Sequence, residues 1–261
     1  MSAKNGPQPE INMDRKTAVT RQRRPAAETP VRPVHRGISG CLLNSFGMWL
    51  TRHLVRLEGR GLENLPASAP YILAPNHETF VDGMWVASFL PREQFKLFCS
   101  LAGSDLLTDY GLFGRIIMRV GRGVPIDRHG SPLSGLQLAR AQLEAGEILM
   151  IHPEGTRSHD GRLGRIQEGA AFIAKRCRVP IIPVFIDGGY EIFGRHSTWP
   201  TPRDENGEKR RLILTFGKPL DPADFRSARD MTAALAAWMN EKFAQKEVPR
   251  LYASEKQAGS P

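Results

Sequence analysis

Short apolar runs alternate with helical periodicity along most of the chain from residue 70 onward. Residues 131–146, 168–177 and 228–245 read as helices between or after apolar runs that have the length of strands. The strand-like runs are 71–74, 123–126, 147–151, 179–186 and 211–216. The middle runs are apolar at successive positions, which is typical of strands covered on both faces. This alternation predicts an α/β fold, a layered mixed or parallel sheet with helices on both faces.

An amphipathic helix is predicted ahead of the sheet, over residues 38–57, and we assign residues 38–58 to it. Its apolar stripe is Ile38, Leu42, Leu43, Phe46, Trp49, Leu50, Leu54 and Leu57. The opposite side is polar and includes Arg52 and Arg56. Such a stripe either covers the core of its own domain or docks on a membrane surface, where Trp49 and the two arginines would suit the interface. The pattern alone leaves both interpretations open.

Composition divides the chain into three parts. Residues 1–37 are rich in proline and arginine and poor in large apolar side chains, which predicts a disordered basic tail. Residues 38–250 are long enough for a single α/β domain, and residues 251–261 are predicted to be flexible. The net charge is +9, and more than half of it lies in the tail. A charge of this sign favours a polyanionic partner such as an anionic membrane surface.

Other partners and compartments are less well supported by the composition. The basic tail lacks interleaved aromatic residues and the rest shows no recognition-helix pattern, so nucleic acid is not an expected partner. Cys41, Cys99 and Cys177 have neither disulfide nor metal-site spacing, which favours a reducing compartment. We find no run of about 18 apolar residues, and therefore expect no membrane-spanning helix.

Two polar loops follow predicted strands, at the edge of the sheet where ligands gather in such folds. The first, "PNHETFVDG", carries His77 and, five residues later, Asp82. A histidine held by a carboxylate is a common general base near neutral pH. The alternative is that "TFVD" is only a capping-box pattern at a helix start, which would explain Thr79 and Asp82 without chemistry.

The second loop, "PEGTRS", covers residues 153–158 and combines glycine, a hydroxyl and an arginine. Its backbone N–H groups and its arginine fork suit a phosphate or a carboxylate. A turn closed by a Glu154–Arg157 ion pair is the alternative. Between the two loops, "GRGVPIDR" places Arg122 and Arg128 at the ends of a strand, either as an anion clamp or in an ion pair with Asp127.

The order of these motifs, His77/Asp82, then Arg128, then "EGTRS", then "VPIIPV", resembles the glycerolipid acyltransferase family. The resemblance implies an acyltransferase that moves a fatty acyl group from acyl-CoA or acyl carrier protein to a hydroxyl of a lysolipid. The first acceptor it suggests is 1-acyl-sn-glycerol-3-phosphate, which would give phosphatidate. Acyl-CoA or the carrier protein would be a co-substrate, and no cofactor, metal or covalent enzyme intermediate is implied.

The resemblance also implies roles for individual residues. His77 would deprotonate the acceptor hydroxyl and Asp82 would hold its imidazole in the productive tautomer. The acceptor head group would be bound by Arg128, Glu154, Gly155, Thr156 and Arg157. A supporting strand would run from Val179 to Val184. The protein would be monotopic on the cytoplasmic face of a membrane, held by the amphipathic helix and assisted by the tail.

Two departures from the family pattern affect the acceptor. Gln167 and Glu168 stand where basic residues are usual, so the acceptor is open between lysophosphatidate and another lysolipid, including a lyso amino-acid lipid. His152 replaces a common phenylalanine, and we interpret it as a neighbour of the site and not a second base. The non-enzymatic alternative is a membrane module that binds anionic lipid without turnover.

Overall fold

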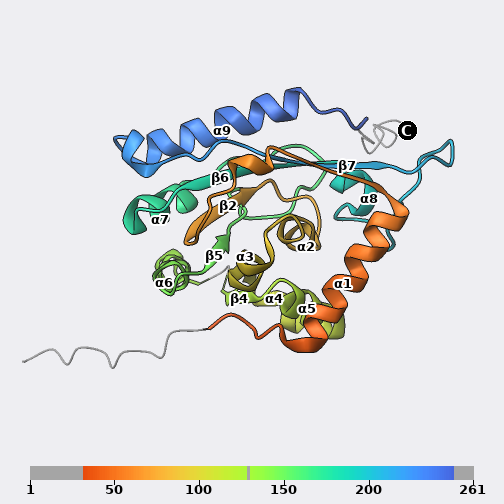
Figure 1. The fold of residues 1–261 in the computed structure, drawn as a ribbon, viewed down its shortest axis with the longest axis horizontal. Helices are drawn as coiled ribbons and strands as arrows, with labels where there is room; N and C mark the ends of the chain where they lie inside the picture. Colours follow the sequence, from red (N-terminus) through yellow and green to blue (C-terminus); the bar gives the residue numbers. More distant parts are fainter. Residues whose placement is uncertain (1–31, 128–129, 250–261) are drawn as a thin grey trace, which may run out of the picture.

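The computed structural model describes residues 32–127 and 130–249, and Figure 1 shows their fold. Residues 1–31 of the predicted tail, the predicted flexible residues 251–261 and Arg128 lie outside the described residues. Seven strands of the described part form one sheet. They are β1 (Arg56–Arg60), β2 (Tyr71–Pro75), β3 (Phe98–Gly103), β4 (Gly123–Ile126), β5 (Ile148–Met150), β6 (Ile181–Asp187) and β7 (Arg211–Phe216).

The sheet is mixed, which confirms the predicted fold class. Its strand order is β1-β7-β6-β2-β5-β3-β4, and all neighbours are parallel except β6 and β7, which are antiparallel. All five predicted strands are present. The hydrophobic pattern does not predict β1 or β3, because the "RLEGR" of β1 is mostly charged and "FCSLAG" in β3 has no turn signal ahead of it.

Helices lie on both faces of this sheet. Their bounds are α1 (Gly37–Leu54), α2 (Asp82–Ala87), α3 (Arg92–Leu97), α4 (Asp105–Asp109), α5 (Gly111–Val120), α6 (Pro132–Glu144), α7 (Gly169–Cys177), α8 (Gly189–Phe193) and α9 (Ala228–Ala244), with 3-10 turns at Leu62–Asn64 and Pro222–Asp224. The predicted helices 131–146, 168–177 and 228–245 correspond to α6, α7 and α9, which pack on one face (Figure 1). Helices α1 and α2 contribute to the core on the other face.

The central strand β2 shows how the two cores are separated. Successive side chains of a strand point to opposite faces. Tyr71 and Leu73 therefore join the core under α1 and α2, while Ile72 and Ala74 join the core under α6, α7 and α9. All four side chains are fully buried. Because helices cover both faces of β2, its buried part holds only apolar side chains. The polar residues that follow it, from Asn76 onward, lie beyond its carboxyl end.

The folded part begins earlier than residue 38, so the predicted tail is too long. The backbone N–H of Val34 donates to the carbonyl of Gly123 at 2.9 Å, next to the sheet. Arg36 is buried, and its guanidinium donates to the carbonyls of Val120 and Phe95 while lying 4.0 Å from the Phe95 ring centroid. These contacts attach the start of α1 to the domain.

Helix α1 differs from the predicted helix in its end and in its orientation. It ends at Leu54, and Leu57 belongs to β1, because the chain turns extended at Val55 to pair with β7. The residues of α1 that are buried are Gly40, Asn44 and Met48, whereas Ile38, Phe46 and Trp49 are 83%, 60% and 59% exposed. The interpretation of the apolar stripe as core cover is therefore wrong for its residues from Ile38 to Leu50, and it holds only at Leu54 and Leu57, which pack against the core.

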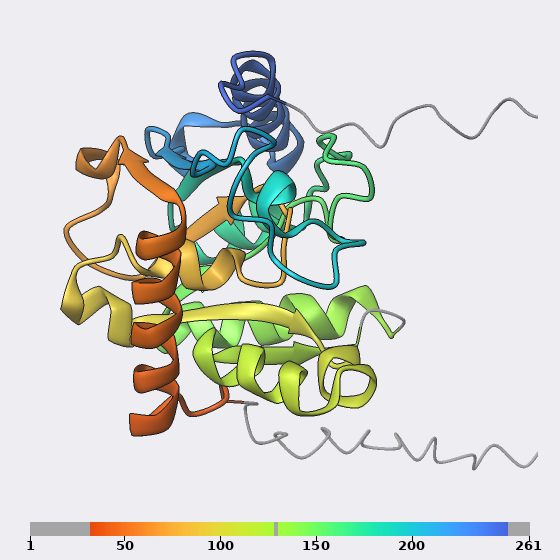
Figure 2. The same ribbon diagram turned by 90° about the vertical axis from the view of Figure 1, so that its right-hand side faces the viewer.

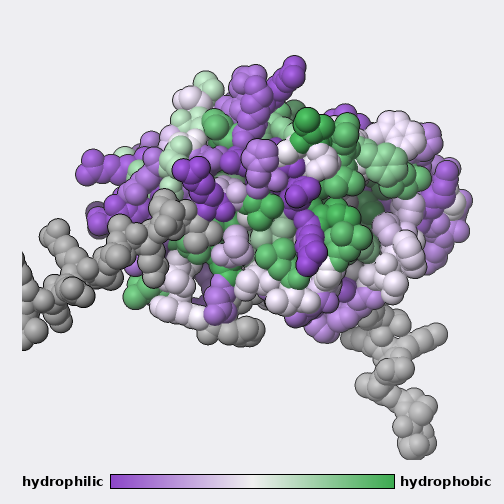
Figure 3. Space-filling view, turned by 90° about the horizontal axis from the view of Figure 1, so that it is seen from below, coloured by the Kyte–Doolittle hydropathy of each residue, from purple (hydrophilic) through white to green (hydrophobic). Residues whose placement is uncertain are grey.

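The exposed stripe of α1 is part of a larger apolar surface. Figure 2 shows α1 running along the outside of the molecule, and its lower end contacts α5. Leu112 and Phe113 of α5 are also exposed. Figure 3, which views the molecule from below, shows apolar residues gathered on this face. Among residues 32–127 and 130–249, no helix combines the length and apolarity needed to cross a membrane.

Candidate active site

Asn76 extends the sheet at the point where β2 ends. Its side-chain Nδ2 donates to the carbonyl of Ile186 at 3.0 Å, and its Oδ1 accepts from the N–H of Ile186 at 2.7 Å. The amide thereby makes the two hydrogen bonds of a strand partner with β6, although the chain has already left β2. This fixes the start of the loop that carries His77, and no sequence pattern indicates this role for Asn76.

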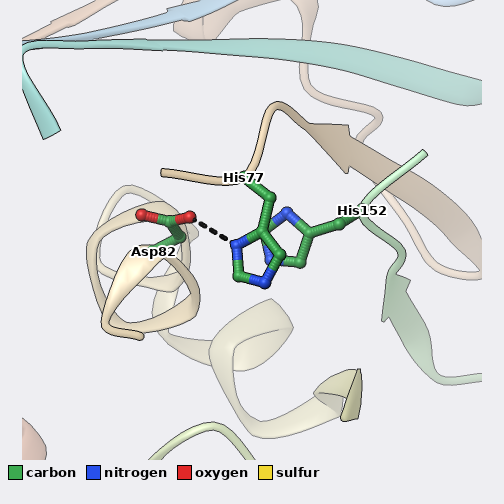
Figure 4. Close-up of side chains that lie close together, drawn as sticks. All are labelled: His77, Asp82 and His152. Carbon is green, nitrogen blue, oxygen red and sulfur yellow. Dashed lines mark hydrogen bonds and ion pairs between the residues drawn. The ribbon is translucent and has the colours of Figure 1, made fainter. Parts of the chain in front are cut away.

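His77 and Asp82 lie together, as their spacing predicts (Figure 4). The ring Nδ1 of His77 is 2.9 Å from Oδ2 of Asp82. Asp82 is the first residue of α2 and is 1% exposed. Its carboxylate also accepts from the N–H of Glu78 and from both the N–H and the hydroxyl of Thr79. Burial raises the pKa of Asp82, and the hydrogen bonds from Thr79 and Glu78 oppose that shift.

Only one of the two hydrogen bonds of a capping box is present at Thr79 and Asp82. Asp82 does accept from the N–H of Thr79, but α2 begins at Asp82 itself and its N-cap is Val81. The Thr79 hydroxyl accepts from the N–H of Val81 and donates to Asp82. These contacts orient the carboxylate toward His77. The oxygens of Asp82 therefore both stabilise the loop and bind the histidine.

His152 follows β5, the parallel neighbour of β2, and its ring stacks on that of His77 (Figure 4). The ring centroids are 3.6 Å apart and the planes differ by 9°. Its Nδ1 is 3.2 Å from the carbonyl oxygens of both Pro75 and Asn76. Burial, together with the adjacent His77, lowers the pKa of His152 to about 3, so the ring is neutral at physiological pH. The prediction that His152 neighbours the site is confirmed.

The ligand atoms of His77, Asp82 and His152 lie within 4.8 Å of one another, which raises the question of a metal site. Lone pairs of imidazole nitrogens lie in the ring plane, and two parallel stacked rings do not aim them at a common point. Asp82 already accepts several hydrogen bonds, and Nδ1 of each histidine is engaged. The arrangement fits an oriented base better than a metal ligand set.

The "PEGTRS" loop lies against the His77 loop and holds its backbone. Glu154 is 5% exposed, and its carboxylate accepts from the N–H of His77 at 2.7 Å and from the N–H of Gly164 at 2.6 Å. The N–H of Ser158 donates to the carbonyl of His77 at 2.7 Å. Glu154 therefore bonds to the backbone of His77 and does not form the ion pair with Arg157 that was one alternative.

Gly155 and Thr156 form the exposed tip of this loop. Gly155 has a φ of +75°, and a side chain there would also meet the amide of Gln167, which donates to the carbonyl of Glu154. The Thr156 hydroxyl is 3.4 Å from the guanidinium of Arg195, which also donates to the carbonyl of Arg157. Arg195 lies outside every motif, so no pattern in the sequence indicated it.

Arg157 lies beside an aromatic cluster at the edge of the site. Its guanidinium carbon is 3.4 Å from the ring centroid of Phe80, and its Nη2 is 3.5 Å from the hydroxyl of Tyr110. Arg122, in contrast, makes a two-pronged ion pair with Glu147, both contacts at 2.8 Å, and also donates to the carbonyl of Lys96. These bonds give Arg122 a structural role. Arg128, the other arginine of the predicted anion clamp, is outside the described residues.

Two cavities meet at the stacked histidines. One, of about 300 Å³, is bounded by His77, His152 and Arg157 and continues between apolar side chains of α1, α2 and α5. The other, of about 390 Å³, also reaches both histidines and extends past Gly155 and Gln167 to α6 and α7. An apolar groove of about 700 Å³ runs between α1 and the segment around Trp199, and it shares Phe80, Met84 and Phe113 with the first cavity.

Known proteins resemble the chain in sequence and in fold. The chain is 27% identical over 188 residues to a 1-acyl-sn-glycerol-3-phosphate acyltransferase of Bacillus subtilis, covering 71% of this chain and 85% of the relative. It is 34% identical over 132 residues to a chloroplastic enzyme of the same name from Brassica napus, covering 49% of this chain but only 36% of the plant protein. The crystal structure of the 1-acyl-sn-glycerophosphate (LPA) acyltransferase PlsC from Thermotoga maritima superposes with a TM-score of 0.65 at 23% identity, covering 80% of each chain, which shows a shared fold.

A family model described as Acyltransferase matches residues 56–187. This range runs from β1 to the end of β6 and contains both loops of the candidate site. It therefore includes His77, Asp82 and the "PEGTRS" segment, the residues that carry the resemblance noted in the sequence. The chain belongs to the Acyltransferase family.

Proposed function

We propose that the protein transfers a fatty acyl group from acyl-CoA or acyl carrier protein to the free hydroxyl of 1-acyl-sn-glycerol-3-phosphate, giving phosphatidate. The observation that carries this proposal is the His77–Asp82 pair at the meeting point of two cavities, with Arg157 on the wall of one of them. The names of the Bacillus and Brassica relatives support the choice of acceptor.

His77 acts as the general base. Because Nδ1 faces Asp82, Nε2 is the ring atom that takes the proton of the acceptor hydroxyl. The hydroxyl oxygen then attacks the thioester carbonyl, a C–O bond forms and the C–S bond breaks. The departing thiolate recovers the proton from the imidazolium of His77. Asp82 stabilises that imidazolium and keeps the proton of the neutral ring on Nδ1.

The surroundings of the base support a lipid substrate. The 300 Å³ cavity is lined mainly by apolar residues such as Phe46, Met84 and Ile117, which suit an acyl chain. Arg157 supplies a guanidinium and Thr156 a backbone N–H for the head group, while the N–H of Gly155 donates to the carbonyl of His152 and shapes the tip. Arg128 stays a sequence-based candidate for the same role. Glu154, through its bonds to His77 and Gly164, positions the base instead of touching the head group.

A second acceptor class is a lysolipid without a phosphomonoester, such as a lyso amino-acid lipid. The observation that favours it concerns Gln167, whose side chain donates to the carbonyl of Glu154 and carries no charge for a phosphate. The adjacent Glu168 is negatively charged. A carboxylate near a phosphate-binding site repels the phosphate and lowers the affinity of the site for it.

The membrane is the proposed location of the reaction. The exposed stripe on α1, together with Leu112 and Phe113 of α5, would enter the interface of a bilayer. Phe46 of the stripe and Phe113 also line the 300 Å³ cavity, so a lipid could pass from this surface toward His77. We place the protein as a monotopic enzyme on the cytoplasmic face, where the tail would meet anionic lipid.

The test is a transfer assay with purified protein, labelled acyl-CoA or acyl carrier protein, and a panel of lysolipids that includes both acceptor classes. We expect the labelled product with lysophosphatidate, and none with His77→Ala at an unchanged unfolding temperature. Transfer only to the amino-acid lipid would select the second class. Binding of anionic lipid with no transfer to any acceptor would support a non-enzymatic membrane module.

A further inference from the structure

His152 touches the proposed base but takes no part in the proton transfer described above. We propose that His152 is a positioning residue, whose ring holds the imidazole of His77 in the plane that faces Asp82. The inference rests on the proposed role of His77 as the base. It concerns a residue that lies one position before the "PEGTRS" loop, on a different strand end from His77.

The geometry of the stack gives His152 this role. The hydrogen bond between Nδ1 and Asp82 fixes one edge of the His77 ring, and a single bond of this kind does not by itself fix the tilt of a ring plane. A second ring, parallel within 9° and centred 3.6 Å away, blocks the tilt toward its own side. A displacement of about 1 Å at a reacting group can cost about a hundredfold in rate. If His152 blocks the tilt, removing its ring should therefore lower kcat by a measurable factor.

His152 is itself fixed by the strand end that carries His77. Carbonyl oxygens only accept hydrogen bonds, so the contacts to Pro75 and Asn76 require the proton of His152 to be on Nδ1. Those two carbonyls directly precede His77 in the chain. The His152 ring, which we call the platform, is thus attached to the same backbone as the His77 ring that it supports.

The environment keeps the platform uncharged. The titratable groups that act on the His152 ring are His77 and Asp82 on the facing loop. The walls of the two cavities that reach the ring also carry Asp105, Tyr110, Asp127 and Arg157. Burial and His77 lower the pKa of His152 to about 3. When His77 becomes an imidazolium during turnover, it therefore meets the face of a neutral aromatic ring instead of a second positive charge.

Two substitutions of His152 distinguish a positioning role from a role as a second base. Phenylalanine keeps a flat ring and has no nitrogen, whereas alanine removes the ring. We expect His152→Ala to lower kcat by about tenfold to a hundredfold, with KM for the acceptor within about twofold. We expect His152→Phe to recover most of that loss. His35→Ala, at an exposed histidine before α1, is the matched control.

Two further readouts test positioning directly. The proton on Nδ1 of His77, hydrogen-bonded to Asp82, should give a downfield proton resonance in the wild type and in His152→Phe. That resonance should be lost or broadened in His152→Ala while near-ultraviolet circular dichroism stays unchanged. The pH at half-maximal kcat/KM should be the same in the wild type and in His152→Phe, because the platform does not titrate in the working range.

Three outcomes would overturn the proposal. They are an unaffected His152→Ala, a His152→Phe variant as impaired as His152→Ala, and a resonance that persists in His152→Ala. A His152→Phe profile that loses an ionisation seen in the wild type would be a fourth, because it would make His152 a second base. If the wild type transferred no acyl group, the proposed function would fail, while the resonance would still report whether His152 holds His77.

Discussion

The carboxylate of Glu154 accepts a 2.7 Å hydrogen bond from the backbone N–H of His77. This contact joins two segments that are 77 residues apart, and it places the "PEGTRS" loop behind the base. The other carboxylate oxygen accepts from the N–H of Gly164. Both oxygens are needed, because each serves a different backbone donor.

Glu154→Gln tests these two contacts by replacing one carboxylate oxygen with an NH₂ group. The amide has one acceptor oxygen and would turn its NH₂ toward one of the two N–H donors. Leaving a buried donor unpaired costs about 1–3 kcal/mol, so we expect the free energy of unfolding to fall by that amount and kcat to fall with it. Urea unfolding and steady-state kinetics would measure the two effects. Glu63→Gln, at an exposed glutamate away from the site, is the control and should change neither.

Asp82→Asn should reduce turnover by about a hundredfold to ten-thousandfold. It should also lower the free energy of unfolding by about 1–3 kcal/mol, because the carboxylate accepts from the N–H groups of Glu78 and Thr79 and an amide NH₂ cannot accept. The variant loses the negative charge that stabilises the imidazolium and no longer requires the proton of His77 to be on Nδ1. The check is kcat under saturating donor and acceptor. Asp109→Asn, at an exposed position at the end of α4, is the control. Near-normal turnover of Asp82→Asn would argue against the assigned pair.

Arg157→Ala should act on the acceptor and not on the acyl donor. Loss of a charged hydrogen bond to the head group costs about 1.5–3 kcal/mol, which corresponds to about a tenfold to hundredfold increase in KM for the acceptor. Arg165→Ala, at an exposed arginine further along the same loop, is the matched control. From the sequence alone, Arg128→Ala is expected to act in the same direction. Equal acceptor dependence in the Arg157 variant and the control would make Arg157 structural.

The buried Glu78 predicts a pH dependence of stability. Burial raises its pKa well above the ordinary 4.5, and Lys246, Glu191 and Asp82 are the charged groups around it. The folded state therefore retains a proton that the unfolded state releases, so the stability is fully present below about pH 4.5 and declines as pH rises above it. Glu78→Gln should flatten this decline.

Urea unfolding of the wild type and Glu78→Gln from pH 4.5 to pH 8 would measure the effect. Glu205→Gln, at an exposed carboxylate on the surface, is the control and should follow the wild type. A Glu78→Gln curve that declines as steeply as the wild-type curve would show that Glu78 is not the titrating group.

The apolar stripe of α1 predicts how the protein binds vesicles. Trp49→Glu should weaken binding to neutral vesicles, because it places a charge where an apolar side chain would enter the interface. Leu133→Glu is the matched control, since Leu133 is 67% exposed but lies on α6, away from the stripe. High salt should release only part of the wild type, because salt screens charge but does not weaken apolar insertion. Vesicle sedimentation would measure both effects, and equal binding by the two variants would rule out α1 as the anchor.

The elements with strong local patterns, and the residue types that give the two loops their chemistry, can be predicted from the amino-acid order alone. Apolar runs such as 211–216 became strands with the predicted bounds, and His77 lies beside Asp82 because both belong to one short loop. Periodicity and near-neighbour spacing are properties of a few consecutive residues. They can therefore be recognised without knowing which segments meet.

The contacts that these residues make with distant segments depend on how the chain folds. The order β6-β2-β5 brings Asn76 to Ile186, Glu154 to the His77 backbone and His152 onto the His77 ring. The stripe on α1 is exposed because Gly40, Asn44 and Met48 are the residues that pack inward. A strand neighbour or a buried helix face depends on contacts between parts of the chain far apart in sequence, and no short window of residues contains that information.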